Sequence, residues 1–550
     1  MTIRSWIALS IVLAGATAAA DPDPLVVNTL SGRVRGVATA SGPAWLGVPY
    51  ALPPTGDRRW RPSVPTPSWE SWPERTGADG VYRANELGSA CLQPWDDGPH
   101  GSENCLFLNV FAPPGAVNAP VFVHIHGGAN FFGWGEDDGG GFTRHGVVVV
   151  TMNYRLGMMG LLAHPALTRE GGGTSSNYHS WDQIRALEWV RDNIASFGGD
   201  PNNVTLGGFS AGAGDTLALI ASPVARGLFK RATPHAVGDD WVTGEGWHSL
   251  ALREWMGERV AARLGCGSDV PDVAACLRAL PAETIVEEWG GSDWGPTVDG
   301  VILPRPAGEQ IAVNGGTVPL LMGFNREETA SFIGGDTPDP MSWNQFVLFT
   351  NDLKPARIAN QARPLYPASD YESLRWAYLI MATDSVHGCP TRRVVRATQN
   401  TTYRYLHTHV LENYEFAQEA RAYHGAEYDL LWWADYMDLT DDERDLSDRM
   451  RRYWTNFMKT GDPNGPGLAT WPKYDPTNER MLITDTPIRE TAAYHAEQCA
   501  VLDQSPVFPS CNTALCRQFM AKINGTPGWW APWGWFLDEI HQPPPPRPPR

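Results

Sequence analysis

Between residues 121 and 220 the chain alternates short apolar, β-branched runs with a helical pattern. The apolar runs are Val121 to Ile125, Val147 to Met152 and Val204 to Leu206. Between the last two, Ile184, Leu187, Val190 and Ile194 recur at the spacing of one helix face. Such alternation is typical of parallel strands joined by helices. We therefore predict an α/β fold with a large, mostly parallel central sheet flanked by helices.

Further apolar runs, at Val318 to Met322 and Thr402 to Val410, extend this predicted sheet. No internal repeat is visible, and Gly and Pro are spread along the chain rather than gathered in one linker. We therefore expect a single domain with insertions. Hydrophobic residues make up 42% and charged residues 19% of the 550 residues, which fits a globular protein. The net charge of -18 argues against nucleic acid as a partner, because phosphate neutralisation needs clustered Lys and Arg.

The first twenty residues have the pattern of a secretory signal peptide. A short positive start at Met1 to Arg4 precedes the apolar run Trp6 to Ala16, and an A-x-A site ends at Ala20. We expect residues 1–20 to be removed, a mature chain that begins at Asp21, and secretion to the periplasm or the cell exterior. The rest of the chain contains no uninterrupted run of about 20 apolar residues, so we predict no transmembrane segment.

Eight cysteines in an exported chain favour disulfides over a metal site. No pair has the C-x-x-C spacing that is common among zinc ligands. Local pairing of Cys91 with Cys105, Cys266 with Cys276 and Cys511 with Cys516 would leave Cys389 to reach Cys499, but the sequence alone leaves the connectivity open.

The C-terminal tail, residues 528–550, differs in composition from the rest of the chain. A cluster of Trp residues precedes a run rich in Pro, which favours an extended, solvated conformation. The cluster either packs on the body of the protein or contacts a membrane interface or a partner. The sequence leaves both interpretations open.

The sequence from Gly208 to Gly212 is G-x-S-x-G, with Ser210 at its centre. In this motif the glycines allow a sharp strand-to-helix turn that exposes the serine hydroxyl above the sheet. The strand Val204 to Leu206 lies before it, and a helical pattern from Ala211 to Ile220 follows it. This context favours a nucleophilic serine over a serine in an ordinary glycine turn.

A nucleophilic serine also needs donors for the oxyanion that forms during attack. The predicted strand that ends at Ile125 is followed by His126-Gly127-Gly128-Ala129, which has the form of the H-G-G-G element of esterases and lipases. We expect the amides of Gly128, Ala129 and Ala211 to form the oxyanion hole. His124 and His126 are spaced like a pair of metal ligands, but no third ligand is evident nearby.

The base and the acid are less well defined by the sequence. In this fold the acid and then the histidine follow the serine along the chain. Glu327 and Glu328 come directly after the run that ends at Met322, where loops of α/β sheets build active sites. Spacing alone does not choose among the eight histidines after Ser210, which are His235, His248, His387, His407, His409, His424, His495 and His541.

At several separate motifs the chain resembles the type-B carboxylesterase family, which includes cholinesterases and fungal lipases. The motifs are Gly47-Val48-Pro49-Tyr50-Ala51, Ser102-Glu103-Asn104-Cys105, Asn153-Tyr154-Arg155-Leu156-Gly157, Phe197-Gly198-Gly199-Asp200-Pro201 and Thr460-Gly461-Asp462-Pro463-Asn464. The resemblance implies the α/β-hydrolase fold over residues 21–527 and hydrolysis of carboxylic esters.

Carried over residue by residue, the resemblance assigns the nucleophile to Ser210. Its G-x-N-x-x-E element falls on Gly323, Asn325 and Glu328, and its H-G element falls on His424-Gly425. The family's disulfides are similar to Cys91 with Cys105, Cys266 with Cys276 and Cys389 with Cys499. The resemblance implies no metal and no organic cofactor.

Four positions near the site depart from the family's pattern. Phe209 stands where cholinesterases have Glu, Asn130 replaces an aromatic residue, Thr329 replaces a glycine, and Pro234-His235-Ala236 removes a serine that helps to hold the acid. The loss of the Glu disfavours choline esters. We therefore predict a secreted hydrolase of small to medium, largely uncharged esters.

Aromatic residues near the motifs are candidate walls of the substrate pocket. They are Phe131, Phe132, Trp134, Phe209 and Trp432, and each of them could instead belong to the core. Two further functions stay open at this point. One is a lipase that acts on acylglycerols at interfaces with its Trp-rich tail as an anchor, and the other is a non-catalytic adhesion or scaffold protein.

Overall fold

The computed structural model describes residues 23–95, 98–237, 247–288 and 295–505. The predicted signal peptide, the tail from residue 528, and Cys511 and Cys516 lie outside these residues.

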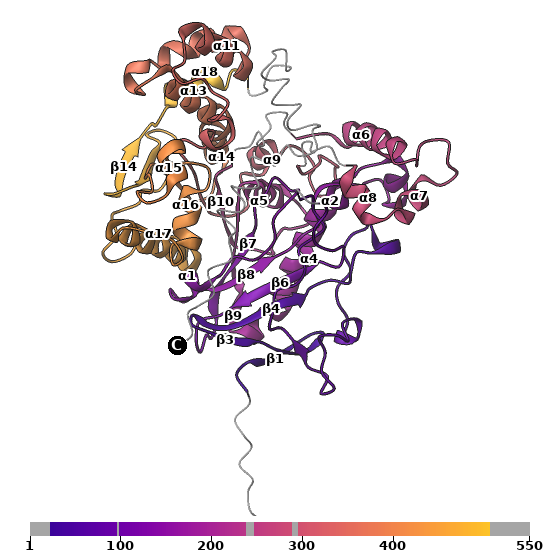
Figure 1. Cartoon of the computed structure of the whole chain (residues 1–550). Coiled ribbons are helices and arrows are strands. Elements are labelled where there is room, and N and C mark those ends of the chain that lie inside the picture. Colours follow the sequence, from indigo (N-terminus) through magenta and orange to yellow (C-terminus); the bar gives the residue numbers. More distant parts are fainter. Residues whose placement is uncertain (1–22, 96–97, 238–246, 289–294, 506–550) are drawn as a thin grey trace, which may run out of the picture.

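The described residues form one large sheet and one small one (Figure 1). The large sheet has eleven strands in the order β14-β13-β12-β11-β10-β9-β7-β8-β6-β4-β3. It is parallel from β13 to β8 and antiparallel at both edges. The small sheet has the order β1-β2-β5. The bounds are β1 (Val26–Thr29), β2 (Gly32–Arg35), β3 (Val37–Thr39), β4 (Gly42–Pro49), β5 (Tyr82–Arg83), β6 (Phe107–Phe111), β7 (Ala119–Ile125), β8 (Val148–Met152), β9 (Gly199–Phe209), β10 (Arg231–His235), β11 (Leu320–Asn325), β12 (Thr402–His407), β13 (Arg480–Thr484) and β14 (Arg489–Ala492).

All five strands predicted from apolar runs are present, with differences at their ends. β9 is longer than predicted because it pairs with β7 from Gly199 onward. β11 begins after Pro319, which has no N–H to donate to a neighbouring strand, and its pairing with β12 continues to Asn325. β12 ends at His407, where its pairing with both neighbours ends.

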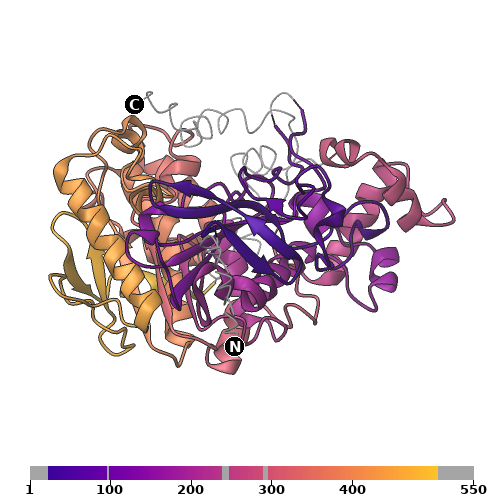
Figure 2. The same ribbon diagram turned by 90° about the horizontal axis from the view of Figure 1, so that it is seen from below.

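Helices surround the sheet, as the alternating pattern predicts (Figures 1 and 2). Seen from below in Figure 2, the C-terminal elements lie on one side of the molecule and helices of the 250–290 region lie on the other. The α-helices are α1 (Gly140–Thr143), α2 (Gly157–Leu161), α3 (Pro165–Glu170), α4 (Tyr178–Asn193), α5 (Ala211–Ala221), α6 (Leu250–Arg263), α7 (Val273–Ala279), α8 (Ala282–Glu287), α9 (Ala307–Asn314), α10 (Ala330–Ile333), α11 (Trp343–Leu353), α12 (Ala356–Ala362), α13 (Leu374–Thr383), α14 (Cys389–Ala397), α15 (Glu415–Ala420), α16 (Ala426–Tyr428), α17 (Asp441–Thr460) and α18 (Ala496–Leu502). Two π-helical turns are η6 (Asp384–Gly388) and η7 (Asp429–Trp433).

The strand β7 shows how the sheet separates two hydrophobic cores. Val121, Val123 and Ile125 pack in one core together with residues of α4 and α5. Phe122 points to the other face and packs against Phe142. Both faces of the central strands are therefore covered, which explains why these strands are continuous apolar runs rather than alternating ones.

Three disulfides join Cys91 to Cys105, Cys266 to Cys276 and Cys389 to Cys499. They are the three pairs that the family resemblance implies. In the part of the chain that the structure describes, none of the helices is long and apolar enough to cross a membrane.

Candidate active site

Ser210 lies in the sharp turn between β9 and α5. Its backbone is in an unusual conformation, with φ 55° and ψ -120°. A Cβ at Gly208 would lie 2.2 Å from the carbonyl oxygen of Gly212, and a Cβ at Gly212 would lie 2.2 Å from that of Ile125. Both flanking positions therefore require glycine, and the strained turn is the one expected for an exposed nucleophile.

His424 lies within hydrogen-bond distance of both Ser210 and Glu328. The Ser210 Oγ lies 2.8 Å from Nε2 of His424, and Nδ1 of His424 lies 2.5 Å from Oε2 of Glu328. The structure thus brings together three side chains that are 96 and 214 residues apart in sequence. Because a carboxylate only accepts hydrogen bonds, Nδ1 donates to Glu328 and leaves Nε2 free to accept from the serine.

Glu328 follows β11 and is completely buried. Its second oxygen, Oε1, accepts hydrogen bonds from the backbone N–H of Asn325 at 2.7 Å and from the Asn325 side chain at 3.1 Å. Burial raises the pKa of this carboxyl, but the neighbouring His387 and His424 and the hydrogen bonds together hold its pKa below the ordinary value. Glu328 is therefore ionised at neutral pH.

Two of the positions that depart from the family's pattern lie near Glu328 and form hydrogen bonds of their own. The Thr329 hydroxyl is buried and donates to the carbonyl of Leu379 at 2.8 Å. Ala236, which falls in the region of the missing serine, donates its N–H to the carbonyl of Gly323. The hydrogen bonds from Asn325 hold Glu328 in place without that serine.

The glycine-rich loop after β7 approaches the nucleophile closely. A Cβ at Gly127 would lie 3.2 Å from the Cβ of Ser210. Gly128 and Ala129 have φ angles of 101° and 51°, and the N–H groups of Phe131 and Phe132 close the turn onto the carbonyl of Gly128. Within the described residues, the N–H groups of Gly128 and Ala129 donate to no protein acceptor. They are available for a ligand oxygen.

Asn130 fixes this loop to the helix that follows the serine. Its side-chain amide donates to Oδ1 of Asp215 on α5 at 3.1 Å, and its side-chain oxygen accepts from the Tyr154 hydroxyl at 3.1 Å. Gln183 donates to the other oxygen of Asp215 at 2.6 Å. All four side chains are fully buried. No local sequence pattern indicates this network, because its members are distant in the chain.

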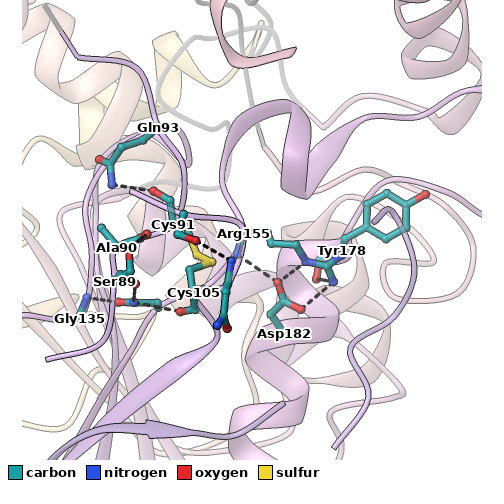
Figure 3. Close-up of a disulfide and its surroundings, with 12 residues drawn as sticks. Ser89, Ala90, Cys91, Gln93, Cys105, Gly135, Arg155, Tyr178 and Asp182 are labelled. Carbon is teal, nitrogen blue, oxygen red and sulfur yellow. Dashed lines mark hydrogen bonds and ion pairs between the residues drawn. A yellow bond between two sulfur atoms is a disulfide. The ribbon is translucent and has the colours of Figure 1, made fainter. Parts of the chain in front are cut away.

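The Cys91–Cys105 disulfide braces the far end of the same loop (Figure 3). Gln93 donates to the backbone carbonyl of Cys91 at 3.0 Å. The same side chain accepts from the N–H of Gly133 at 2.8 Å. The loop is therefore anchored on both sides of Phe131 and Phe132.

The Asn153-Tyr154-Arg155 motif adds a second support. Asn153 accepts from the N–H of Gly135 at 2.8 Å and donates to the carbonyl of Ser89 at 2.8 Å. Arg155 forms two 2.7 Å hydrogen bonds with the buried carboxyl of Asp182, as Figure 3 shows. The motif thus connects the loop that the Cys91–Cys105 disulfide closes, the glycine-rich loop after β7 and α4.

The structure places the five candidate pocket aromatics in three different environments. Phe209 lies beside His424, with ring centroids 4.8 Å apart, and stacks on Tyr428 at 4.5 Å. Trp432 is only 3% exposed and packs in the core against Phe122 and Phe142. Phe131, Phe132 and Trp134 are half-buried on the loop after the oxyanion element.

The sequence did not single out three side chains near His424, of which His387 was only one of eight candidate histidines. The Phe332 ring centroid lies 4.8 Å from that of His424, and the buried carboxyl of Glu427 is coupled electrostatically to Glu328. His387 is 1% exposed, and its ring centroid lies 5.9 Å from that of His424. They could not be found from local sequence patterns because only the fold brings them to the site.

His124 and His126 do not converge on a common ligand site in the structure. The His124 Nε2 lies 3.1 Å from the Tyr428 hydroxyl, and the His126 Nδ1 lies 2.7 Å from the carbonyl of Gly127. Among the described residues, grouped metal-ligand atoms occur instead at Glu328, His387 and His424, which lie within 4.8 Å of one another.

Comparisons with known proteins point to one family. Residues 23–502 match the Carboxylesterase family. The para-nitrobenzyl esterase of Bacillus subtilis (strain 168) is 32% identical over 494 residues, which cover 84% of this chain and 95% of that protein. Carboxylesterase 1C of Rattus norvegicus is 29% identical over 513 residues, with 84% of this chain and 90% of that protein covered.

Solved structures of carboxylesterases have the same fold. A PNB esterase superimposes with a TM-score of 0.73 at 29% identity and covers 87% of this chain and 100% of its own. A carboxylesterase of Geobacillus stearothermophilus gives a TM-score of 0.72 at 28% identity, with 87% and 99% covered. The central sheet, the strained serine turn and these likenesses lead to one conclusion: the chain belongs to the carboxylesterase family and is a carboxylic ester hydrolase with the α/β-hydrolase fold.

Proposed function

We propose that Ser210, His424 and Glu328 are the catalytic triad of a serine esterase that acts through an acyl-enzyme. The observation that carries this proposal is the pair of contacts at His424, 2.8 Å to the Ser210 hydroxyl and 2.5 Å to the Glu328 carboxylate. A nucleophile within hydrogen-bond reach of a base, which is in turn oriented by an acid, is the arrangement that activates a serine.

In the first half-reaction the Ser210 oxygen attacks the ester carbonyl while Nε2 of His424 takes its proton. The carbonyl oxygen becomes an anion, which the N–H groups of Gly128, Ala129 and Ala211 stabilise. The imidazolium then donates its proton to the alcohol oxygen as the ester bond breaks. The alcohol leaves, and the acyl group stays on Ser210.

In the second half-reaction a water molecule gives a proton to Nε2 of His424 and attacks the acyl carbon. The proton returns to the Ser210 oxygen when the tetrahedral intermediate collapses, and the carboxylic acid is released. Glu328 stays ionised throughout, since it holds the imidazole in the correct tautomer and stabilises its positive charge.

The site favours uncharged substrates because its surroundings supply aromatic rings rather than negative charge. Phe209 and Phe332 both lie against His424. Burial and the neighbouring Glu328 raise the pKa of Glu427 to about 8, so this carboxyl is largely neutral at pH 7. A cationic alcohol group would therefore gain little from Glu427, and Glu328 is already paired with His424. We infer that small to medium neutral esters are the preferred class.

We also propose that the protein is exported, with residues 1–20 as a signal peptide and residues 21–527 as one hydrolase domain. Three disulfides in the described residues support an oxidising compartment. Expression in a bacterial host followed by fractionation and N-terminal sequencing tests this proposal. A chain outside the cytoplasm that begins at Asp21 is expected, and a cytoplasmic chain that keeps Met1 would contradict it.

Hydrolysis of p-nitrophenyl esters of increasing acyl length tests the catalytic proposal. Wild-type protein is expected to release p-nitrophenol, and Ser210→Ala is expected to lose at least about a thousandfold in kcat. A folded wild type without turnover would favour a scaffold function on the same fold. A rate that rises sharply once a long-chain ester exceeds its solubility would favour a lipase.

A further inference from the structure

His387 is an unusual side chain to find beside a catalytic histidine. It is 1% exposed, and neither of its ring nitrogens has a hydrogen-bond partner among the described residues. Burial is the main cause that lowers the pKa of this ring, to about 4. A buried polar group without a partner costs free energy, so the placement of this ring asks for an explanation.

The ring belongs to a rigid part of the fold. His387 lies in the π-helical turn η6. This turn ends directly before Cys389, which forms a disulfide with Cys499. The buried Arg404 on β12 donates to the carbonyl of Gly388 at 3.0 Å. The turn is therefore held from two sides, and His387 presents its nitrogen to Glu328 and His424 from a fixed position.

The three side chains offer two imidazole nitrogens and one carboxylate oxygen within 4.8 Å of one another. Two His and one Glu are a ligand set that binds zinc in proteins. Bonds of about 2.0 to 2.1 Å to a tetrahedral zinc ion place the ligand atoms about 3.3 Å apart, so the set needs side-chain shifts of roughly an ångström. The direct contact between His424 and Glu328 would have to open to admit the ion.

The charges around the site also suit a divalent cation. Glu328 supplies one negative charge. The neighbouring Glu427 is buried and has one carboxylate oxygen without a hydrogen-bond partner among the described residues.

We propose that Glu328, His387 and His424 form an inhibitory binding site for a divalent transition-metal ion such as Zn²⁺. The inhibitory effect rests on the proposed triad, whereas the binding itself does not. The ion is a regulator here and takes no part in ester hydrolysis. It would enter from the side of Ser210 and His424, which are 8% and 6% exposed, because Glu328 is fully buried.

Binding blocks catalysis through the tautomer of His424. If the ion binds Nδ1, the neutral imidazole carries its proton on Nε2 and cannot accept one from Ser210. If the ion binds Nε2, the lone pair that accepts the serine proton is used directly. If the ion binds Nδ1, it also separates Glu328 from the ring.

Zinc titration of esterase activity tests the proposal, with His387→Phe as the matched variant. Phe keeps a ring of similar size but removes the ligand nitrogen. Circular dichroism and thermal unfolding show that the variant is folded, and its zinc inhibition is expressed relative to its own zinc-free rate. We expect Zn²⁺ to inhibit the wild type and EDTA to restore its activity. His387→Phe is expected to need at least about tenfold more Zn²⁺, since even outer partners of metal ligands are worth about 10 to 100-fold in affinity. Mg²⁺ should not inhibit, because it prefers oxygen ligands.

A binding measurement separates this proposal from the catalytic one. Calorimetry with Zn²⁺ on Ser210→Ala, which has no serine hydroxyl to compete, is expected to show one site that disappears in the double variant with His387→Phe. That result supports the metal site even if the wild type hydrolyses no ester. Equal zinc sensitivity of the wild type and His387→Phe, or zinc binding that is unchanged in the double variant, would overturn the proposal.

Discussion

Asn130 offers a sharp test of how the oxyanion loop is held, because two variants separate its side chain from its backbone. Asn130 has φ 60°, a left-handed conformation, and its side chain connects the loop to Asp215 and Tyr154. Asn130→Gly removes both hydrogen bonds and keeps a residue that tolerates this φ angle. Asn130→Ala removes the same bonds and adds backbone strain.

The expected size of the effect follows from the two lost contacts. The Tyr154 hydroxyl keeps a partner, because it also lies 2.9 Å from the carbonyl oxygen of His126, whereas Oδ1 of Asp215 loses the amide of Asn130. A buried group that loses its hydrogen-bond partner costs about 1 to 3 kcal/mol, so Asn130→Gly should lower the free energy of unfolding by about 1 to 3 kcal/mol. The left-handed conformation should cost Asn130→Ala about 1 to 2 kcal/mol more. Complete loss of one oxyanion donor costs about 100 to 1,000-fold in kcat, so a loosened loop should cost about 10 to 100-fold.

Three measurements distinguish a positioning role from a general loss of stability. kcat and KM for p-nitrophenyl butyrate are expected to change unequally, with most of the loss in kcat. Affinity for a trifluoromethyl ketone, which forms a tetrahedral adduct with the serine, should fall in parallel with kcat. Thermal unfolding reports the stability cost. Asn202→Ala, at an exposed position of β9, serves as the control and should match the wild type in all three.

A wild-type kcat and ketone affinity in Asn130→Gly, together with a lower melting temperature, would contradict this prediction. In that case the network would stabilise the fold without positioning the oxyanion donors.

Three further predictions concern other parts of the site. Phe209→Glu should raise kcat/KM for butyrylcholine relative to p-nitrophenyl butyrate by about fivefold, the effect of roughly 1 kcal/mol from a partly exposed ion pair, and an unchanged ratio would show that residue 209 does not face the alcohol group. Glu427→Gln should become more stable relative to the wild type as pH rises from about 5 to 8. The pKa of Glu427 is about 8 in the folded state, above its value in the unfolded state, so the folded wild type loses stability over this range as the carboxyl is forced to ionise. A melting temperature that changes with pH equally in the two proteins would contradict this prediction. The double variant Cys389→Ala with Cys499→Ala opens a link across 110 residues and should lose about 2 to 5 kcal/mol, measured by urea unfolding against the wild type; a loss below about 1 kcal/mol would show that the link contributes little.

The sheet and the turn at Ser210 could be predicted from the sequence, because the residue patterns that indicate them are local. The apolar runs around β7, β8 and β9 and the glycines beside Ser210 are determined by neighbours a few residues away. The ends of β9 and β12 are set by pairing with other strands, so apolar runs alone placed them several residues off.

The partners of the nucleophile are not local, and residue patterns left them open. Eight histidines follow Ser210, and only the resemblance to a known family singled out His424. The contact of Asn130 with Asp215 spans 85 residues and has no sequence signature. His387 gave no signal either, since its position beside Glu328 depends on a π-helical turn and on the packing of η6 against β11.

Covalent labelling reports whether Ser210 is the nucleophile. Wild-type protein treated with a p-nitrophenyl phosphonate should gain one phosphonyl group per chain, located at Ser210 by peptide mass spectrometry. Activity should fall in proportion to labelling, and His424→Ala should react at least about a hundredfold more slowly. A stoichiometric adduct at another residue, or full activity in a protein labelled at Ser210, would contradict the account.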